Sequence, residues 1–446
     1  MDLPSLVVSI LLVAGCTSSG RPADPAGPTG SDDSADPVEP APFDGHRTSG
    51  RDTRASVDDT AGGPHPVVTE ETVEDQDLDD SWIFSEETIH GIEIEISADS
   101  RTSLDADPYT FVPAAVTFDG ERLEEVGLRL RGQIGSFRTL TGKPKFKIDF
   151  NEYVPDQRFW GLEALALNNE VVDCSYIKEP ISYRVFRAAG IPAPRTGFAM
   201  VTVNDASYGL YVIVEVPDDR FLRRVYEFPD GNLYDGKYVW YGGWSYTLLD
   251  FAAGVDHLYE LEEGVDVAHT DITGVSHMLN TSAGRPDFYA RMDEVIDWEE
   301  FHREQLGEQW AGQEDGYGMN QNNYRVYFDP ADDRVEFIPW DLDYSFLEDY
   351  AWGFSWAAPS GNIASSCMVD ATCYAAQRDL VTDVLDAIEA DDLPGRVEDM
   401  IALIASDVAI DPRRECSIHS VVYYQNLVRS WVATRSDYMR SFWGVP

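Results

Sequence analysis

The sequence predicts an α+β fold in two lobes, because strand-like and helix-like patterns occupy different parts of the chain. From residue 82 to about residue 240, most segments alternate apolar and polar residues, as strands with one buried face do. From about residue 265 onward, longer segments repeat apolar residues at helical spacing. We therefore expect one domain over residues 81–446, with a first lobe at 81–240 and a second lobe at 241–446.

The first lobe is predicted to be an antiparallel sheet with one main helix. The helix begins near Ser175 and ends at Gly190, a residue type that favours helix termination, and Pro192 and Pro194 follow it. A hairpin is expected around Asn204, whose residue type tolerates tight turns. The expected strands span residues 92–96, 114–118, 127–132, 143–150, 163–168, 199–203 and 208–216.

The second lobe is predicted to be mostly helical. Its amphipathic segments span residues 297–310, 378–390, 396–408 and 417–443. A strand pair is expected within it, at residues 324–329 and 334–338, with a loop through Pro330.

The N-terminus resembles a lipoprotein signal followed by a tether. Residues 1–16 contain a short apolar run, then Ala14, Gly15 and Cys16, the cysteine that would carry the lipid. A buried strand with an ordinary cysteine is the alternative. Residues 17–80 are rich in Pro, Gly, Ser and Asp, which predicts a disordered acidic tether. We expect a lipid-anchored exported protein of the cell envelope, at the outer membrane or cell surface.

The charge and the cysteines limit the possible partners and folds. A formal net charge of -47 argues against nucleic acid or an anionic membrane as partner, so the membrane contact is expected through Cys16 only. The four other cysteines favour two disulfides in an exported protein, with free thiols as the alternative. Local pairing of Cys367 with Cys373 leaves Cys174 with Cys416. Zinc is less favoured because no CxxC or matching His pair is present.

Three of the five lysines lie within five residues, at Lys143, Lys145 and Lys147. On a strand they share one face, because successive side chains alternate sides. A cationic face in so acidic a protein suits a polyphosphate, although a solvated strand edge would give the same pattern.

Two carboxylates, Asp341 and Asp343, follow the apolar segment 337–340. At a strand end they can share a hard Mg²⁺ or Mn²⁺ ion with phosphate oxygens. The alternative is that both acids lie at the end of the strand in contact with water and bind no metal ion. Together with the lysine strand, this pair suggests a metal-nucleotide phosphotransferase.

Several motifs, taken in order, resemble the CotH-type family of secreted protein kinases, named for a spore coat protein. The resemblance covers roughly residues 90–345. It implies a divergent, bilobal protein-kinase-like fold that uses ATP and a divalent ion to phosphorylate protein serine or threonine. The motifs are Leu128-Arg-Leu-Arg-Gly132, Lys143-Pro-Lys-Phe-Lys147, Arg184-Val-Phe-Arg-Ala-Ala-Gly-Ile-Pro-Ala-Pro-Arg195, Tyr208-Gly-Leu-Tyr211 and Phe337-Ile-Pro-Trp-Asp-Leu-Asp343.

The resemblance assigns a phosphate-binding lysine and its partner. Lys147 is placed against the nucleotide phosphates, with Lys145 as the second choice. Glu179 takes the part of the helix carboxylate that orients this lysine, and a helix first-turn acid is its alternative interpretation. Pro180 departs from the family pattern and leaves the start of the helix open.

Three further residues are assigned to the cofactor. Arg131 and Gly132 begin a segment that would cover the phosphates, although an ordinary turn fits it equally. Glu215 falls where a hinge would meet the adenine through backbone groups, and a plain strand end is the alternative.

The segment 313–324 is assigned to the catalytic loop. Asp315 is the candidate base for the acceptor hydroxyl, and Asn320 lies at the kinase-like five-residue interval from it. The resemblance instead favours Asn323 as the metal ligand beside Asp341, with Asp343 assisting. An Asx-rich turn is the alternative.

We therefore predict an ATP-dependent protein kinase of the cell envelope, acting on itself or on a neighbouring protein with Mg²⁺ or Mn²⁺. A catalytically inactive pseudokinase or surface scaffold is the alternative, and a carbohydrate-active or calcium-binding module is a third possibility. The absence of GxSxG and HExxH argues against a serine hydrolase or zinc protease.

Overall fold

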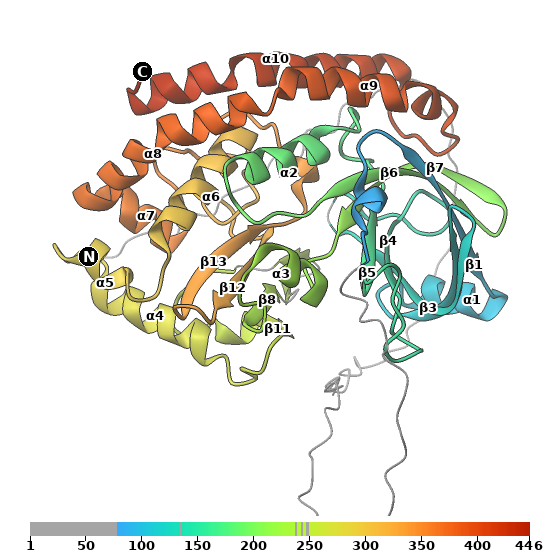
Figure 1. Ribbon diagram of the computed structural model, residues 1–446, viewed down its shortest axis with the longest axis horizontal. Coiled ribbons are helices and arrows are strands. Elements are labelled where there is room, and N and C mark those ends of the chain that lie inside the picture. The colour runs from blue at the N-terminus through green and yellow to red at the C-terminus, as the bar shows by residue number, and fades with distance from the viewer. Residues whose placement is uncertain (1–77, 134, 237–238, 242–243, 247–248) are drawn as a thin grey trace, which may run out of the picture. The chain divides into compact units, whose positions relative to one another are not determined.

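The computed structural model describes residues 78–446, apart from residues 134, 237–238, 242–243 and 247–248 (Figure 1). The predicted signal at 1–16, Cys16 and nearly all of the predicted tether at 17–80 lie outside the described residues. None of the helices in the described part is both long and apolar enough to cross a membrane.

Seven strands close into a barrel in the order β1-β2-β3-β4-β5-β7-β6. Neighbouring strands run antiparallel except β1 and β6, which are parallel and complete the barrel. The expected antiparallel sheet is corrected in this respect. The strands are β1 Ile89–Ile96, β2 Val112–Phe118, β3 Glu121–Arg131, β4 Lys145–Asp149, β5 Ala164–Asn168, β6 Thr196–Val203 and β7 Ala206–Glu215.

The alternation in the sequence sets which side chains fill the barrel. Along β1, every second residue is buried, and Ile92 and Ile94 pack with Leu128, Phe146 and Ile148 in the barrel core. Residues between these positions face outward. This is why the outward side chains of β4 are available to the site.

The main helix of the first lobe, α2 Lys178–Ala188, starts three residues later than predicted. Pro180 lies in its first turn, where the missing backbone N–H has no helical partner to lose. The helix ends before Gly190, which has a φ of +89°. Two shorter helices, α1 Ala98–Ala106 and α3 Asp219–Val225, and the 3-10 turn η2 Ser81–Phe84 were not predicted.

A second sheet has the strand order β11-β8-β12-β13. Its strands are β8 Asn232–Gly236, β11 Tyr259–Glu263, β12 Tyr324–Asp329 and β13 Arg334–Pro339, and a separate hairpin pairs β9 Val239–Tyr241 with β10 Trp244–Tyr246. Because β8 pairs with β11 and β12, the second lobe begins before the boundary expected at residue 240. The predicted pair 324–329 and 334–338 is confirmed as β12 and β13.

Helices make up the rest of the second lobe. The four predicted helices are present, with α8 beginning earlier than expected because Asp370 caps it. The helices are α4 Thr270–Ser282, α5 Phe288–Met292, α6 Trp298–Ala311, α7 Asn362–Val369, α8 Ala371–Ala390, α9 Leu393–Ile410 and α10 Ile418–Trp443, with 3-10 turns η3 Asp256–Leu258 and η4 Leu342–Tyr344.

One apolar core joins the two lobes. Side chains of α2 pack with those of α6, α8, α9 and α10, and α9 and α10 lie above α2 in Figure 1. Lys143 and Asp411 add a buried ion pair of 2.7 Å between the segment before β4 and the segment after α9.

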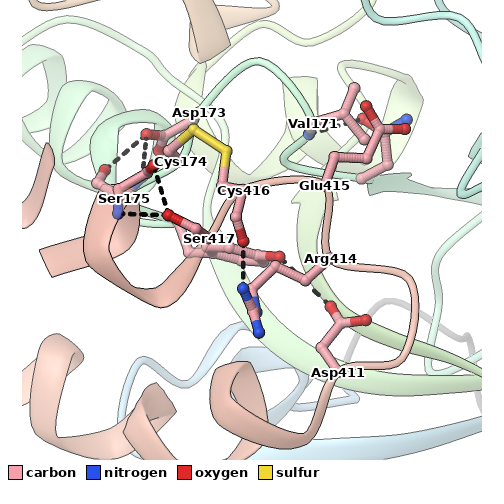
Figure 2. Close-up of a disulfide and its surroundings, with 12 residues drawn as sticks. Val171, Asp173, Cys174, Ser175, Asp411, Arg414, Glu415, Cys416 and Ser417 are labelled. Carbon is pink, nitrogen blue, oxygen red and sulfur yellow. Dashed lines mark hydrogen bonds between the residues drawn. A yellow bond between two sulfur atoms is a disulfide. The ribbon is translucent and has the colours of Figure 1, made fainter. Parts of the chain in front are cut away.

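The two disulfides have the predicted pairing. Cys174 and Cys416 join the segment before α2 to the segment before α10, with Cα atoms 5.7 Å apart (Figure 2). Cys367 and Cys373 join α7 to α8, with Cα atoms 5.1 Å apart. The longer-range bridge therefore ties the helix that carries Glu179 to the C-terminal helix.

Candidate active site

A cavity of about 320 Å³ lies between the barrel and the second sheet. Strands β3, β4 and β5 form one side, and β8, β11, β12 and the segment after β13 form the other. Both cationic and acidic side chains line it, together with Ala166, Val216 and Trp340. The charged lining residues are Arg129, Arg131, Lys147, Arg325, Asp235, Glu260, Glu262 and Asp341.

Lys145 lies between the two carboxylates that the sequence predicted as metal ligands. Its Nζ donates to Asp341 Oδ1 at 2.8 Å and to Asp343 Oδ2 at 2.7 Å. Strand β4 delivers the lysine, and the turn after β13 delivers both acids. Asp341 has a φ of +49°, and its backbone N–H donates to the Tyr183 hydroxyl of α2 at 3.1 Å. The fold thus brings together residues almost 200 positions apart.

The electrostatics of this trio differ between its members. Burial opposes a charge on Lys145, but Asp341 and Asp343 outweigh burial and raise the pKa of the lysine. For Asp341, burial is outweighed by Lys145 and Arg131, which lower the pKa of this carboxyl. For Asp343, burial prevails over Lys145 and raises the pKa to about 6. Asp343 therefore takes up a proton more readily than Asp341, although both carboxyls are mainly ionised at pH 7.

The other two lysines of the cluster have different surroundings, so the three do not share one face. Lys143 precedes β4 and points away from the cavity, where its Nζ donates to Leu210 O at 2.6 Å and to Asp411 at 2.7 Å. Lys147 lines the cavity, and burial lowers its pKa. Lys145, the second choice from the sequence, is thus the lysine that contacts the predicted metal ligands.

Glu179 is buried at the start of α2 and bonds to an amide rather than to a lysine. Asn168 Nδ2 donates to its two carboxylate oxygens at 2.8 and 2.7 Å. Asn168 Oδ1 in turn accepts from Arg131 at 3.2 Å, so the amide links helix α2 to strand β3. Burial raises the pKa of Glu179 to about 8, which Lys145 only partly offsets.

Asp315 lies in the turn before β12 and is surrounded by amides. Its carboxylate accepts from Asn320 at 2.6 Å, Asn322 at 3.1 Å and Asn323 at 2.9 Å. Asn323 Nδ2 also donates to the backbone carbonyl of Asp341 at 3.0 Å, which joins the two predicted catalytic segments. Burial raises the pKa of Asp315 to about 7, although the Asn320 and Asn322 hydrogen bonds lower it. A base with a pKa near neutrality is suited to proton transfer.

Two glycines after β3, Gly132 and Gly135, lie near the cavity and the acids. Gly132 lines the cavity, and Gly135 has a φ of +88°. A Cβ on Gly135 would lie 2.2 Å from the hydroxyl of Tyr344, the residue after Asp343. Glycine is therefore needed there, both for the backbone conformation and for the close approach. Arg131 also lines the cavity, and its assignment with Gly132 to phosphate binding stays a prediction.

Glu215 does not present its carboxylate to the cavity. The carboxylate accepts from Arg195 at 2.7 Å and from Arg224 at 2.6 and 3.0 Å, and its backbone N–H donates to Arg195 O at 2.9 Å. Val216, the next residue, is the one that lines the cavity. Burial opposes a charge on Glu215, but the two arginines lower its pKa.

Sequence reasoning missed several residues of the site. Asn168 ends β5 with no motif around it, and Arg325 stacks on Trp340 with its guanidinium carbon 4.7 Å from the ring centre. Glu170 is 2% exposed, and among the described residues no group donates a hydrogen bond to its carboxylate. The pattern that could have indicated Asn168 and Glu170 is the run of three polar residues Asn-Asn-Glu, 168–170, at the end of a buried strand.

The donor set at Asp341 and Asp343 fits a hard divalent ion. All its atoms are oxygens, as Mg²⁺ and Mn²⁺ prefer, and Lys145 shows that this position accepts a positive charge. The side-chain amide nitrogen of Asn323 donates hydrogen bonds to the Asp315 carboxylate and to the backbone carbonyl of Asp341. Elsewhere in the described part, ligand atoms of His302, Cys367 and Cys373 cluster within 4.8 Å, but the two sulfur atoms are bonded to each other.

Residues 128–439, more than half of the chain, match the family described as CotH kinase protein. The chain belongs to the CotH family. A curated relative, the inner spore coat protein H of Bacillus subtilis (strain 168), is 25% identical over 251 residues. That match covers 55% of this CotH-family chain and 64% of the relative, which is less than two thirds of the relative's length.

Two solved structures are similar at low levels. A HipA, HipB and operator DNA complex of Shewanella oneidensis MR-1 is 11% identical, with a TM-score of 0.29, over 79% of this chain and 72% of that one. The Helicobacter pylori proinflammatory kinase CtkA is 10% identical, with a TM-score of 0.25, over 66% and 90%. Because these TM-scores are low, we draw no conclusion about the CotH chain from the two structures. The family match itself supports a kinase-like function.

Proposed function

We propose that this CotH-family protein is an ATP-dependent protein kinase of the cell envelope. The observation that carries the proposal is the arrangement of Lys145, Asp341, Asp343 and Asp315 beside a cavity that also contains cationic groups. These are the charge types that phosphoryl transfer requires: cations for the phosphates, carboxylates for a metal, and a carboxylate base for the acceptor.

The cavity supplies surfaces for the two ends of a nucleotide. Ala166 and Val216 give an apolar wall suited to a base, and Arg131 and Lys147 line the same cavity and suit the phosphates. Gly132 leaves room for a phosphate near the backbone of the covering segment, because it has no side chain. The volume of about 320 Å³ lies at the lower end of the range for small-molecule sites.

Asp341 and Asp343 are proposed to hold a divalent ion, Mg²⁺ or Mn²⁺, with Asn323 fixing the position of Asp341. When bound, the ion supplies positive charge that neutralises the phosphate oxygens. Lys145 occupies this position in the structure, so it must move aside when the ion binds. The charge of Glu179 contributes to the raised pKa of Lys145, so Glu179 in its ionised form would attract the lysine ammonium.

Asp315 is proposed to accept the proton of a serine or threonine hydroxyl in the acceptor protein. The hydroxyl oxygen forms a bond to the γ-phosphorus as the bond from that phosphorus to the β–γ bridging oxygen breaks. ADP leaves with the bonding electrons, and the proton passes to Asp315. Asn320, Asn322 and Asn323 hold the carboxylate in place through the three hydrogen bonds described above.

The acceptor is proposed to be a protein of the envelope or the chain itself, not nucleic acid. A signal at residues 1–16 with a lipid on Cys16 remains part of this proposal, as does the tether at 17–80. The supporting observations are the apolar run before Cys16 and the pair of disulfides, which are typical of exported proteins.

A second candidate function is a pseudokinase that binds a partner without turnover. Two observations favour it: Lys145 lies between Asp341 and Asp343, and Glu179 is hydrogen-bonded to Asn168. In a scaffold this closed arrangement would be permanent. In an enzyme, Lys145 would leave its position so that Asp341 and Asp343 could hold a divalent ion.

The test compares label from γ-labelled and α-labelled ATP in the wild-type protein and in Asp341→Asn, with Mn²⁺ or Mg²⁺ present. We expect label from the γ position only, and a loss of at least about a hundredfold in Asp341→Asn, as for removal of a single group that stabilises transition-state charge. Label from the α position would show nucleotidyl transfer instead. Nucleotide binding without any transfer to the chain or to envelope extracts would establish the pseudokinase function.

A further inference from the structure

The segment that joins the barrel to the second lobe forms part of the cavity wall. We call residues 216–218, between β7 and α3, the connector. Val216 lines the cavity, and Arg325 from the opposite sheet donates to Pro217 O at 2.7 Å. Helix α3 then packs its Phe221 and Leu222 against β8, β12 and β13. The position of the connector therefore sets both the wall of the cavity and the spacing of the two lobes.

Behind the connector, Glu215 is held by two arginines. Arg195 precedes β6, and both its backbone N–H and its guanidinium donate to the Glu215 carboxylate, at 2.9 and 2.7 Å. Arg224, on α3, donates to the same carboxylate and to Ala193 O. The carboxylate is 1% exposed, so these bonds are shielded from water and salt.

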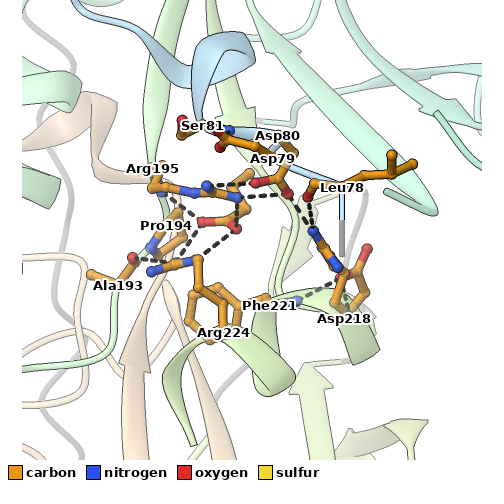
Figure 3. A network of polar contacts seen from close by, with 12 residues as sticks. Leu78, Asp79, Asp80, Ser81, Ala193, Pro194, Arg195, Asp218, Phe221 and Arg224 are labelled. Atoms are coloured by element: carbon orange, nitrogen blue, oxygen red, sulfur yellow. Dashed lines mark hydrogen bonds and ion pairs between the residues drawn. The ribbon is translucent and has the colours of Figure 1, made fainter. Parts of the chain in front are cut away.

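Asp80 extends this network across the two lobes. Its carboxylate accepts from Arg195 at 2.9 and 3.0 Å and from Arg220 Nε at 3.3 Å. Arg195 belongs to the barrel and Arg220 to α3 of the second lobe, so one carboxylate bridges both. Arg220 also donates to Leu78 O at 2.6 Å. Figure 3 shows Asp80, Arg195 and Arg224 facing one another next to α3.

Because of the charges around it, replacing Asp80 should disturb the whole network of ion pairs. Its side chain is 8% exposed, and burial alone would raise its pKa, but Arg195 and Arg220 outweigh burial and lower it. Loss of the carboxylate would remove the ion pairs of Arg195 and Arg220 with Asp80, while Arg195 keeps its bond to Glu215. Removing one partner of a buried ion pair disturbs the remaining charges more than losing an exposed pair does.

We propose that Asp80 is a positioning residue for nucleotide binding: it fixes the connector from behind, without touching the cavity. The inference rests on the proposed function, because it concerns the same cavity. It assigns a role to Asp80, the residue that precedes the 3-10 turn η2. Asp80 thereby becomes part of the nucleotide-binding machinery, coupled to the cavity through Arg195 and Glu215.

The test measures ATP affinity by calorimetry and transfer kinetics in the full chain, for wild type, Asp80→Asn and Asp79→Asn. Asp79 is the matched control, since its carboxylate accepts from Ser81 N at 3.0 Å and is exposed. For Asp80→Asn we expect Kd and KM for ATP to rise roughly two- to thirtyfold, the range for substitutions in packed polar networks. We expect kcat at saturating ATP to stay unchanged, with Asp80→Glu closer to wild type than Asp80→Asn.

Equal affinities for wild type and Asp80→Asn would overturn the inference while leaving the proposed function intact. Equal weakening in Asp79→Asn would also overturn it, because the effect would then not depend on the bridge. A wild-type protein that binds no ATP would remove both proposals together. If Asp80→Asn fails to fold, Arg220→Gln removes the contact from the other lobe, and the same KM increase is required of it.

Discussion

Replacing Lys145 with methionine tests whether this lysine holds the place of the metal. Methionine keeps most of the side-chain volume and removes the ammonium that both carboxylates contact, at 2.8 and 2.7 Å. The lysine is 1% exposed, so water does not replace the lost charge. Asp341 and Asp343 would then face each other as like charges.

The structure sets bounds on the unfolding free energy that Lys145→Met should lose. Breaking a buried ion pair by removing one partner costs roughly 3–5 kcal/mol. Two features reduce that figure. The Asp341 side chain is 20% exposed, and Asp343 has a pKa of about 6, so it can take up a proton at pH 7 for about 1.4 kcal/mol or less. We therefore expect Lys145→Met to lose about 2–3 kcal/mol of unfolding free energy at pH 7.

The metal dependence of the melting temperature gives the sharper result. Without the competing ammonium, Mn²⁺ alone should bind Asp341 and Asp343 more tightly in Lys145→Met than in the wild type. A Mn²⁺ titration without nucleotide, followed by thermal unfolding, should therefore raise the Tm of the variant more than that of the wild type. Lys147→Met is the matched control on the same strand. A Lys145→Met protein with the wild-type Tm and no larger Mn²⁺ shift would refute the reasoning.

Two further predictions concern stability. Loop-closure entropy, for sequence separations of 242 and 6 residues, predicts losses of about 5 kcal/mol for the Cys174→Ser, Cys416→Ser double variant and about 2 kcal/mol for Cys367→Ser, Cys373→Ser. Denaturant unfolding under non-reducing conditions should preserve that order, and the reverse order would contradict it. Burial raises the pKa of Glu304 to about 8, above its unfolded value, so its proton-linked stability is present at low pH and is lost as pH rises from about 4.5 to about 8. Glu304→Gln should flatten this decline between pH 5 and pH 8, and an unchanged slope of unfolding free energy against pH would count against it.

The strands were predictable because their alternation is local. Segments 92–96 and 128–131 show it directly, and both lie in strands in the structure. Closure of the barrel was not predictable, since β1 and β6 pair in parallel across a separation of about a hundred residues. No periodicity in either segment specifies the partner. Short helices such as α1 carry too few turns for a clear apolar stripe.

The chemistry of the site was visible in the sequence, but the choice between neighbouring lysines was not. Lys145 and Lys147 share one face of β4, because side chains on a strand repeat every two residues. The sheet register separates them: Lys145 lies opposite Arg131, and Lys147 lies opposite Arg129 and Ala166. That register depends on neighbouring strands and not on the motif. For the same reason, no pattern in the residues indicated that Asn168 would donate its hydrogen bonds to the Glu179 carboxylate.

The most direct test of phosphoryl transfer at this site is the kcat of Asp315→Asn, measured with ATP affinity on the same samples. Asparagine keeps the size of the side chain and removes the carboxylate that is proposed to accept the proton. We predict that kcat falls by about a hundredfold or more, as for loss of a general base, while Kd for ATP is unchanged. Wild-type kcat in Asp315→Asn would contradict the account, as would a wild-type protein that binds no nucleotide.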